Sequence, residues 1–228
     1  MLTPYLQLPF KVDLTVLQAE VQQCLDQQWV NHYNQKDYEG DWTLIALRSI
    51  DGAMHQVSAQ ESDSYRDTPL LSQCPHIQHF LDQLKCDKMS IRLMRLAAGS
   101  VIKAHRDNHL GYEDGSFRLH LPIWTNDQVI FYIDGKPVHM EVGSCWYANF
   151  NLEHSVVNKG ESDRVHLVVD CLRNKWSDEM MREAGYDFEA EKAAKRTIDP
   201  AAVPEMIALL KAMNTPAAQT LIDQLQQS

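Results

Sequence analysis

The stretch Gln128-Val-Ile-Phe-Tyr-Ile-Asp-Gly-Lys-Pro-Val-His-Met-Glu141 decides the fold. A run of aromatic and β-branched residues precedes the pair Asp134-Gly135, and a shorter run follows it through Val138. An Asp-Gly pair fits the two central positions of a tight hairpin turn, since both positions need a positive φ. We therefore predict an antiparallel hairpin with strands over residues 128–133 and 137–141.

Further segments of strand length lie on both sides of this hairpin, with turn residues such as Ala98-Gly99 and Lys159-Gly160 between them. These segments are Ser90–Ala97, Val101–Ala104, Phe117–Ile123, Ser144–Asn149, His154–Val157 and Arg164–Cys171. Short strands at regular spacing favour a sandwich or barrel, and a jelly roll is the natural arrangement of eight. We expect a mainly β fold with flanking helices around a jelly-roll core.

The segment before the β region mixes helix, strand and loop. Asp13 is a plausible N-cap, and apolar residues follow it at helical spacing as far as Trp29. Trp42–Ser49 has the composition of a strand and ends at the turn signal Asp51-Gly52. We expect this segment to support the β core.

The sequence after the β region has the residue spacing of helices rather than of strands. Met206, Leu209 and Met213 fall on one helical face, which is typical of a packing surface against the barrel or a partner subunit. We therefore expect a β domain with N-terminal support over residues 1–175 and a helical extension over 176–228. The extension is a candidate for a homodimer contact.

Composition narrows the classes of function. The net charge is −10 and basic residues are not clustered, which argues against nucleic acid as a partner. The sequence contains no apolar run long enough for a membrane span, and its first ten residues do not resemble a signal peptide. Five widely spaced cysteines without a CxxC motif fit reduced thiols. We expect a cytoplasmic protein with no nucleic-acid or membrane partner.

The triplet His105-Arg106-Asp107 is the first feature with chemical potential. Residues i and i+2 of a strand point to the same face, so an imidazole and a carboxylate can meet one metal ion. His154 opens a late strand and can complete two histidines and one carboxylate, the set that holds non-haem Fe(II) with open positions. With ten histidines in the chain, a surface turn remains the alternative for the triplet.

Arg164 begins the last strand, whose two faces are both largely apolar. A guanidinium binds a carboxylate through paired hydrogen bonds, and a buried one needs an anionic partner. Spacing alone leaves two arrangements open, an inward Arg164 that binds an acid and one that reaches solvent. Arg118 and His120 share one face of another strand, and the pattern by itself favours solvent for both.

Taken together and in order, these motifs resemble the aspartyl/asparaginyl β-hydroxylase family. The residues that carry the resemblance are Arg95–Gly99, His105-Arg106-Asp107, Arg118–Pro122, Gly143–Trp146, Glu153–Asn158 and Arg164–Asp170. That family belongs to the Fe(II)/2-oxoglutarate oxygenases and has a double-stranded β-helix, a cupin-like jelly roll. The resemblance covers residues 90 to 172.

The resemblance implies that His105 and His154 are metal ligands and that Arg164 binds 2-oxoglutarate. Some family members lack a carboxylate at the position of Asp107, whereas this chain has the full set. His166 lies on the same strand face as Arg164 and is a further candidate near the cosubstrate.

The resemblance also implies that Arg118 and His120 face the active site near 2-oxoglutarate, which reverses the solvent-facing interpretation. Weaker candidates for substrate contacts are Arg92, Arg48 and Trp146, for which packing or a structural ion pair is the alternative. Cationic side chains suit the carboxylate of an amino acid or peptide.

The expected function is an Fe(II)/2-oxoglutarate-dependent hydroxylase that consumes dioxygen. Its substrate is expected to be an amino acid, an Asp/Asn-type residue of a peptide, or a related small metabolite. The rival hypothesis is a non-oxidising cupin-like protein that binds a metal and a small acid as a sensor or isomerase. A helix-capped β scaffold for protein partners is a third alternative, but it leaves the converging polar residues unexplained.

Overall fold

The structure is a computed structural model that describes residues 2–59, 62, 64–107, 109–196, 202–213, 215, 218–219, 221–222 and 225. The chain divides into one unit over Thr3–Tyr186 and a second that holds the residues from Asp187 onward. This division falls later than the boundary expected after residue 175. Helix α3 (Lys175–Glu183) lies in the first unit, where the Tyr112 hydroxyl lies 2.8 Å from Ser177 Oγ.

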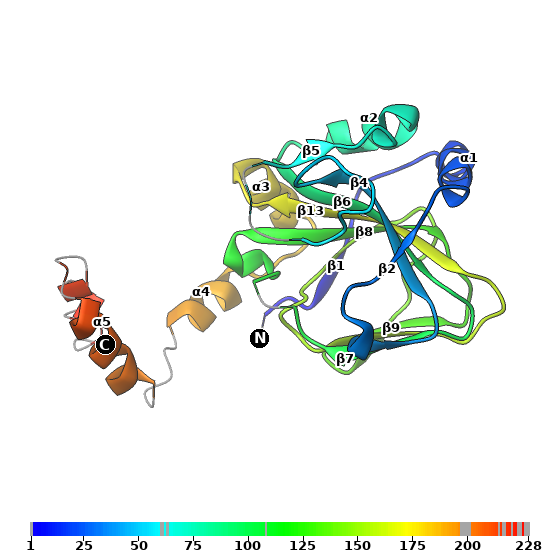
Figure 1. Ribbon diagram of the computed structural model, residues 1–228. Coiled ribbons are helices and arrows are strands. Elements are labelled where there is room, and N and C mark those ends of the chain that lie inside the picture. The colour runs from blue at the N-terminus through cyan, green and yellow to red at the C-terminus, as the bar shows by residue number, and fades with distance from the viewer. Residues whose placement is uncertain are drawn as a thin grey trace. The chain divides into compact units, whose positions relative to one another are not determined.

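The strands of the first unit form two antiparallel sheets (Figure 1). The larger sheet has the order β1 (Tyr5–Leu8), β11 (Cys145–Ala148), β8 (Ser116–Trp124), β13 (Arg164–Leu172), β6 (Lys88–Leu96), β4 (Trp42–Ser49) and β2 (Val30–Asn31), with β5 (Arg66–Asp67) also paired to β4. The smaller has the order β10 (Lys136–Val138), β9 (Val129–Ile133), β12 (His154–Asn158), β7 (Val101–His105) and β3 (Tyr38–Glu39).

The strands β6 to β13 are the eight that the sequence predicts, and their order confirms the jelly roll. In the larger sheet they run β11-β8-β13-β6 and in the smaller β10-β9-β12-β7, so the chain alternates between the sheets as a double-stranded β-helix does. The predicted hairpin is also confirmed. Asp134 and Gly135 have φ values of 51° and 71°, and β10 pairs with β9 on either side of them.

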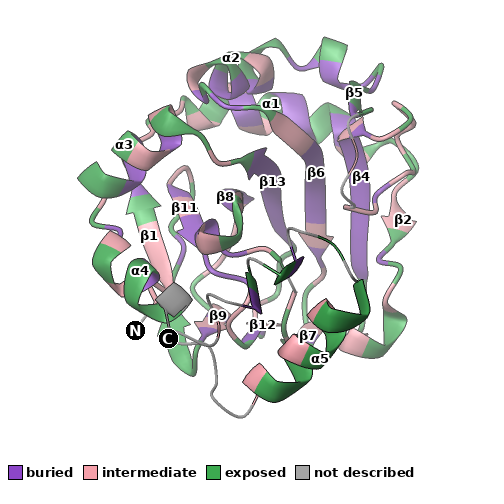
Figure 2. Cartoon of the chain, turned by 90° about the vertical axis from the view of Figure 1, so that its left-hand side faces the viewer, coloured by how far each residue is buried: buried purple, intermediate pink, exposed green. Residues whose placement is uncertain are grey.

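The larger sheet is buried on both faces, and Figure 2 shows β13, β6 and β4 almost wholly as buried residues. Two helices, α1 (Leu14–Leu25) and α2 (Pro75–Gln83), cover its outer face (Figure 1). Asp13 caps α1 as predicted, because its Oδ1 accepts from the backbone N–H of Thr15 at 3.1 Å. The inner face of the larger sheet packs against the smaller sheet, and residues of both sheets share one buried hydrophobic cluster.

The second unit contains α4 (Phe188–Arg196) and α5 (Val203–Met213), and several residues of the expected extension lie outside the described part of the chain. Leu209 and Met213 on the predicted apolar stripe are exposed. Among the described residues, no helix combines the length and the apolar character needed to cross a membrane.

Candidate active site

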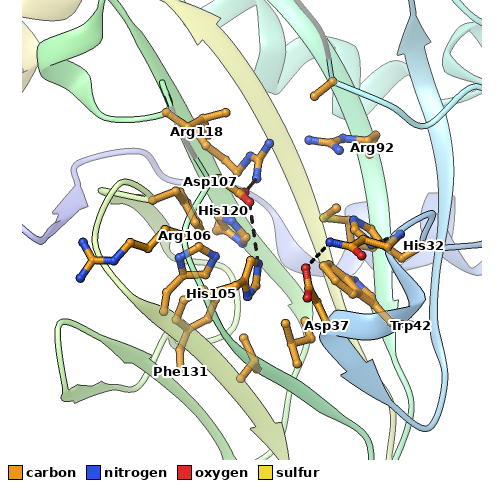
Figure 3. Close-up of a pocket in the computed structure, with 18 of the residues that line it drawn as sticks. His32, Asp37, Trp42, Arg92, His105, Arg106, Asp107, Arg118, His120 and Phe131 are labelled. Atoms are coloured by element: carbon orange, nitrogen blue, oxygen red, sulfur yellow. Dashed lines mark hydrogen bonds and ion pairs between the residues drawn. The ribbon is translucent and has the colours of Figure 1, made fainter.

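A cavity of about 260 Å³ lies in the first unit among residues of both sheets (Figure 3). Its walls include His105, Asp107 and His154, together with Arg118, His120 and Arg164 of the larger sheet. Phe131 and Phe150 add aromatic surface to the same cavity. The residues that the sequence singled out on separate strands are thus brought to one site.

His105, Asp107 and His154 form a compact set of potential ligands. One ligand atom from each side chain can be chosen such that all three lie within 4.8 Å of one another. The pairing of β12 with β7 places His154 directly opposite His105, and the two ring centroids are 4.2 Å apart. Asp107 follows two residues after His105, and its Oδ1 lies 3.8 Å from His105 Nε2.

Backbone carbonyls orient both histidines. His105 Nδ1 lies 2.7 Å from the carbonyl oxygen of Lys103, and His154 Nδ1 lies 3.0 Å from that of Leu152. A carbonyl only accepts, so each Nδ1 carries the proton and each Nε2 keeps a lone pair. Burial and the neighbouring His105 lower the pKa of His154 to about 4, so this ring is neutral at neutral pH. His154 is therefore in the form that binds a metal, and the carbonyl of Lys103 orients the His105 ring in the same way.

Asp107 is held by an arginine rather than by solvent. Arg118 donates from Nη1 to Asp107 Oδ2 at 2.9 Å, which leaves Oδ1 directed towards the histidines. Burial opposes ionisation of Asp107, but the positive charge of Arg118 foremost outweighs it, and the pKa of this carboxyl is lowered. The group is a carboxylate at neutral pH, as metal binding requires.

Asp170 organises the two arginines behind the triad. It accepts from Arg118 Nε at 2.6 Å and Nη2 at 3.2 Å, and from Arg92 Nη2 at 2.7 Å. All three side chains are almost fully buried. Arg92 also donates to the carbonyl of Val57, but its Nε has no hydrogen-bond partner among the described residues. One aspartate thus holds two cations, and Arg92 keeps a free donor.

Arg164 has a different environment. Its residue is 2% exposed, yet no described carboxylate lies within ion-pair distance. Its Nη2 lies 3.0 Å from His166 Nδ1, and its Nε is buried without a partner. Burial lowers the pKa of Arg164 to about 9, still above neutrality, so the buried group is a cation. Such a charge is expensive unless an anion joins it.

The proton positions on His120 and His166 follow from their neighbours. Arg164 only donates, so His166 Nδ1 accepts from it and the His166 proton lies on Nε2. His120 Nδ1, 3.2 Å from the same atom, must then carry its own proton to donate. Nε2 of each ring is buried without a partner among the described residues. Of the two residues, His120 lines the cavity, so its Nε2 is available to a bound molecule there.

Two weaker candidates do not line this cavity. Arg48 sits where β4 pairs with β5 and donates to Asp67 Oδ1 at 2.6 Å, so it lies on a surface ion pair instead. Trp146 of β11 is paired in register with His120, but its indole N–H donates to Ser144 Oγ and its ring packs beside Tyr5. Arg92 does line the cavity, while His166 lies behind Arg164.

Sequence reasoning missed one wall of the cavity and the residue that organises its arginines. His32, Asp37 and Trp42, all from the segment before the β region, form part of the wall (Figure 3). Nothing in their spacing distinguishes them from packing residues. The inward position of Asp170 could have been inferred from the sequence. It continues the alternation that begins at Arg164 on the inner face of β13.

Comparison with known proteins agrees with this geometry. Residues 11–174, well over half of the chain, match the aspartyl/asparaginyl β-hydroxylase family. The chain belongs to this family. The match confirms the resemblance seen in the sequence and includes every cavity residue named above.

Among curated proteins, an L-proline cis-4-hydroxylase of Rhizobium meliloti (strain 1021) is 23% identical over 164 residues, which are 71% of this chain and 57% of that protein. The chain thus matches little more than half the length of this relative. Among solved structures, a 2OG-Fe(II) oxygenase family oxidoreductase from Burkholderia pseudomallei has a TM-score of 0.50 at 14% identity, covering 75% of this chain and 86% of that one. This likeness supports the double-stranded β-helix fold of the family.

Proposed function

We propose that the protein is an Fe(II)/2-oxoglutarate-dependent hydroxylase. The observation that carries the proposal is the buried, unpaired Arg164 in the same cavity as a two-histidine, one-carboxylate set. Such a ligand set is the one that non-haem Fe(II) oxygenases use. Family membership supports the same chemistry.

The described residues fit both groups. His105 and His154 would hold iron through Nε2, and Asp107 through the oxygen that Arg118 does not bind. Arg164 would hold a carboxylate of 2-oxoglutarate, which satisfies its buried charge and its unpartnered Nε. When bound, iron with 2-oxoglutarate and dioxygen would supply the oxidising power that inserts one oxygen atom into a C–H bond, with succinate and carbon dioxide as co-products.

The protein contributes binding, orientation and exclusion of water. Asp170 fixes Arg118, and Arg118 in turn fixes the rotamer of Asp107, so the carboxylate is preorganised for the metal. Phe131, Phe150 and Val156 cover parts of the cavity with apolar surface and limit water beside the reacting groups. Each of these roles is played by side chains in place before any ligand arrives.

The proposed substrate is an amino acid, an Asp/Asn-type residue or a related small metabolite. The cationic Arg92 in the cavity wall suits a substrate carboxylate, since its Nε is a free, buried donor. The similarity to an L-proline hydroxylase supports a small acid of this kind. We propose a small-molecule or peptide partner, no nucleic acid and a cytoplasmic location.

The test is succinate formation from 2-oxoglutarate with anaerobically loaded Fe(II), ascorbate and oxygen. We expect slow turnover that suitable substrates stimulate, and a loss of more than about 100-fold in His105→Ala, because even outer contacts of a metal ligand are worth 10- to 100-fold. His139→Ala is the matched control, since His139 is exposed and outside the cavity. Binding of iron and 2-oxoglutarate without succinate would instead support the non-oxidising sensor.

A further inference from the structure

Asp37 is a carboxylate in the cavity wall that lacks a counter-charge. It belongs to a short turn, Gln35–Asp37, and is half-buried. Its carboxylate accepts a hydrogen bond from the side-chain amide of Asn34, which is neutral. No described Lys or Arg lies within ion-pair distance of it, whereas Asp107 and Asp170 both have arginine partners. Asp37 is therefore free to receive a cation from a ligand.

The neighbouring wall does not neutralise Asp37. His32 stacks on Trp42 with ring centroids 3.7 Å apart and planes 8° from parallel. Burial and the nearby Arg92 lower the pKa of His32 to about 4, so the ring carries no charge at neutral pH. Trp42 is 7% exposed and lines the cavity, yet its indole N–H has no partner among the described residues. The carboxylate of Asp37 and the indole N–H of Trp42 are thus both available to a ligand.

Without Asp37, the three buried arginines around the cavity would outnumber the carboxylates near them. Arg92, Arg118 and Arg164 contribute three positive charges. Asp37 and Asp107, which also line the cavity, and Asp170, which pairs with Arg92 and Arg118, contribute three negative charges that match these three arginines. Arg106 also lines the cavity but is exposed and donates to the carbonyl of Asn151. Fe(II) and the 2-oxoglutarate dianion cancel each other. Apart from the exposed Arg106, the charges around the loaded site would thus cancel.

The cationic and anionic poles of this site are arranged along one wall. In Figure 3, Arg92 lies above the stacked His32 and Trp42, and Asp37 lies lower in the view, beside Trp42. A ligand that spans this wall meets a cation with a free donor at one end and a lone carboxylate at the other. A zwitterion matches both ends, because each of its charges then gains an opposite partner in a site of low dielectric.

We propose that the substrate is a free amino acid whose ammonium group is bound by Asp37 and whose carboxylate is bound by Arg92. This inference rests on the proposed hydroxylase function and narrows its substrate class. A residue within a polypeptide has amide groups where a free amino acid has its two charges, so it would leave Asp37 and Arg92 without partners. Trp42 supplies the remaining hydrogen-bond donor of the wall.

The test compares substrates before it compares variants. Succinate formation by the full chain is measured with each of the twenty free L-amino acids, their Nα-acetyl derivatives, and short peptides that contain Asp, Asn, Lys or Arg. We expect at least one free amino acid to stimulate turnover, and its Nα-acetyl derivative to be poorer by about tenfold or more in kcat/KM, because a charge-assisted hydrogen bond is lost.

Asp37→Asn is then compared with Glu39→Gln, a neighbouring carboxylate that pairs with Lys103 outside the cavity. For the stimulating amino acid, we expect Asp37→Asn to raise KM by about tenfold while the KM for 2-oxoglutarate stays within about twofold. Asp37→Glu should restore part of the loss. Thermal unfolding of each variant verifies that the fold is retained.

Three outcomes would overturn the assignment. One is stimulation by acetylated amino acids or peptides equal to that by free amino acids, and another is an unchanged KM in Asp37→Asn. The third is steady 2-oxoglutarate turnover that no free amino acid stimulates. A complete absence of succinate under every condition would overturn the hydroxylase function itself, so the two failures are distinguishable.

Discussion

The two faces of strand β13 are equally buried but chemically opposite. Val165, Leu167 and Val169 point to the outer face, which helices cover. Arg164, His166 and Asp170 alternate with them and point to the inner face, around the cavity. Among these six residues none is more than 2% exposed. Burial alone therefore does not distinguish a packing face from a functional one.

The two faces of β13 differ in whether they contain buried polar atoms that lack a hydrogen-bond partner. Apolar side chains on the outer face need only contact, which the helices provide. On the inner face, Nε of Arg164 and Nε2 of His166 are buried without partners, as is Nε2 of His120 on the next strand. Buried polar atoms in native proteins are normally hydrogen-bonded, so the unpartnered atoms of Arg164 and His120, both of which line the cavity, indicate where a ligand would bind. Four substitutions test this difference.

Asp170→Asn should have the largest effect on stability. It leaves Arg92 and Arg118 buried without their shared carboxylate, and removing one partner of a buried ion pair costs about 3–5 kcal/mol. Urea unfolding gives the free-energy change. Asp163→Asn, an exposed carboxylate before the same strand, is the control and should change stability by less than about 0.5 kcal/mol.

Leu167→Ala should lower stability while leaving chemistry intact. The side chain is fully buried on the outer face, and such truncations cost about 2–5 kcal/mol through lost burial and a residual cavity. The KM for 2-oxoglutarate should remain within about twofold of the original value. A large rise in this KM without a loss of stability would mean that the outer face also serves the site.

Arg164→Met should raise the stability of the protein but weaken its binding of 2-oxoglutarate. Removal of an unpaired buried cation should raise the free energy of unfolding of the ligand-free protein by about 1–3 kcal/mol. Affinity for 2-oxoglutarate should fall about 100-fold, or about 2.7 kcal/mol, because the carboxylate loses its charge-assisted bonds. Thermal unfolding with and without 2-oxoglutarate measures both effects. A destabilised ligand-free variant would show that Arg164 has a structural partner.

Of the four substitutions, His166→Leu should cause the smallest change in free energy. It removes the acceptor that positions Arg164 Nη2, a hydrogen bond worth about 1 kcal/mol, so the KM for 2-oxoglutarate should rise about fivefold with kcat nearly unchanged. His166→Asn keeps an acceptor and should recover part of the loss. Equal falls in kcat for both variants would contradict a positioning role and point to contact with the reacting groups.

Several parts of the fold could be predicted because they depend on local sequence. The Asp134-Gly135 turn needs positive φ at two adjacent positions, and this requirement is met by the residues themselves. The N-cap at Asp13 acts within one helical turn. The alternation along β13 likewise follows from the two-residue period of a strand.

Other parts could not be predicted because they depend on which face lies inward. The alternation of Arg118 and His120 with leucines fits a solvent-facing pair as well as a buried one. The structure buries both, because α1 lies over the leucine side of β8 and the smaller sheet closes the other side. Distant pairings such as Arg92 with Asp170, 78 residues apart, leave no local signal.

The sequence by itself determined the strand segments, the hairpin and the residue types of the proposed iron and 2-oxoglutarate site. Periodicity, turn propensity and ligand chemistry are properties of short stretches of chain. Only the tertiary structure decided that His105 and His154 lie opposite one another, and that Asp37 and Trp42 from the N-terminal segment complete the cavity. These placements result from the packing of two sheets, and packing depends on the whole chain at once.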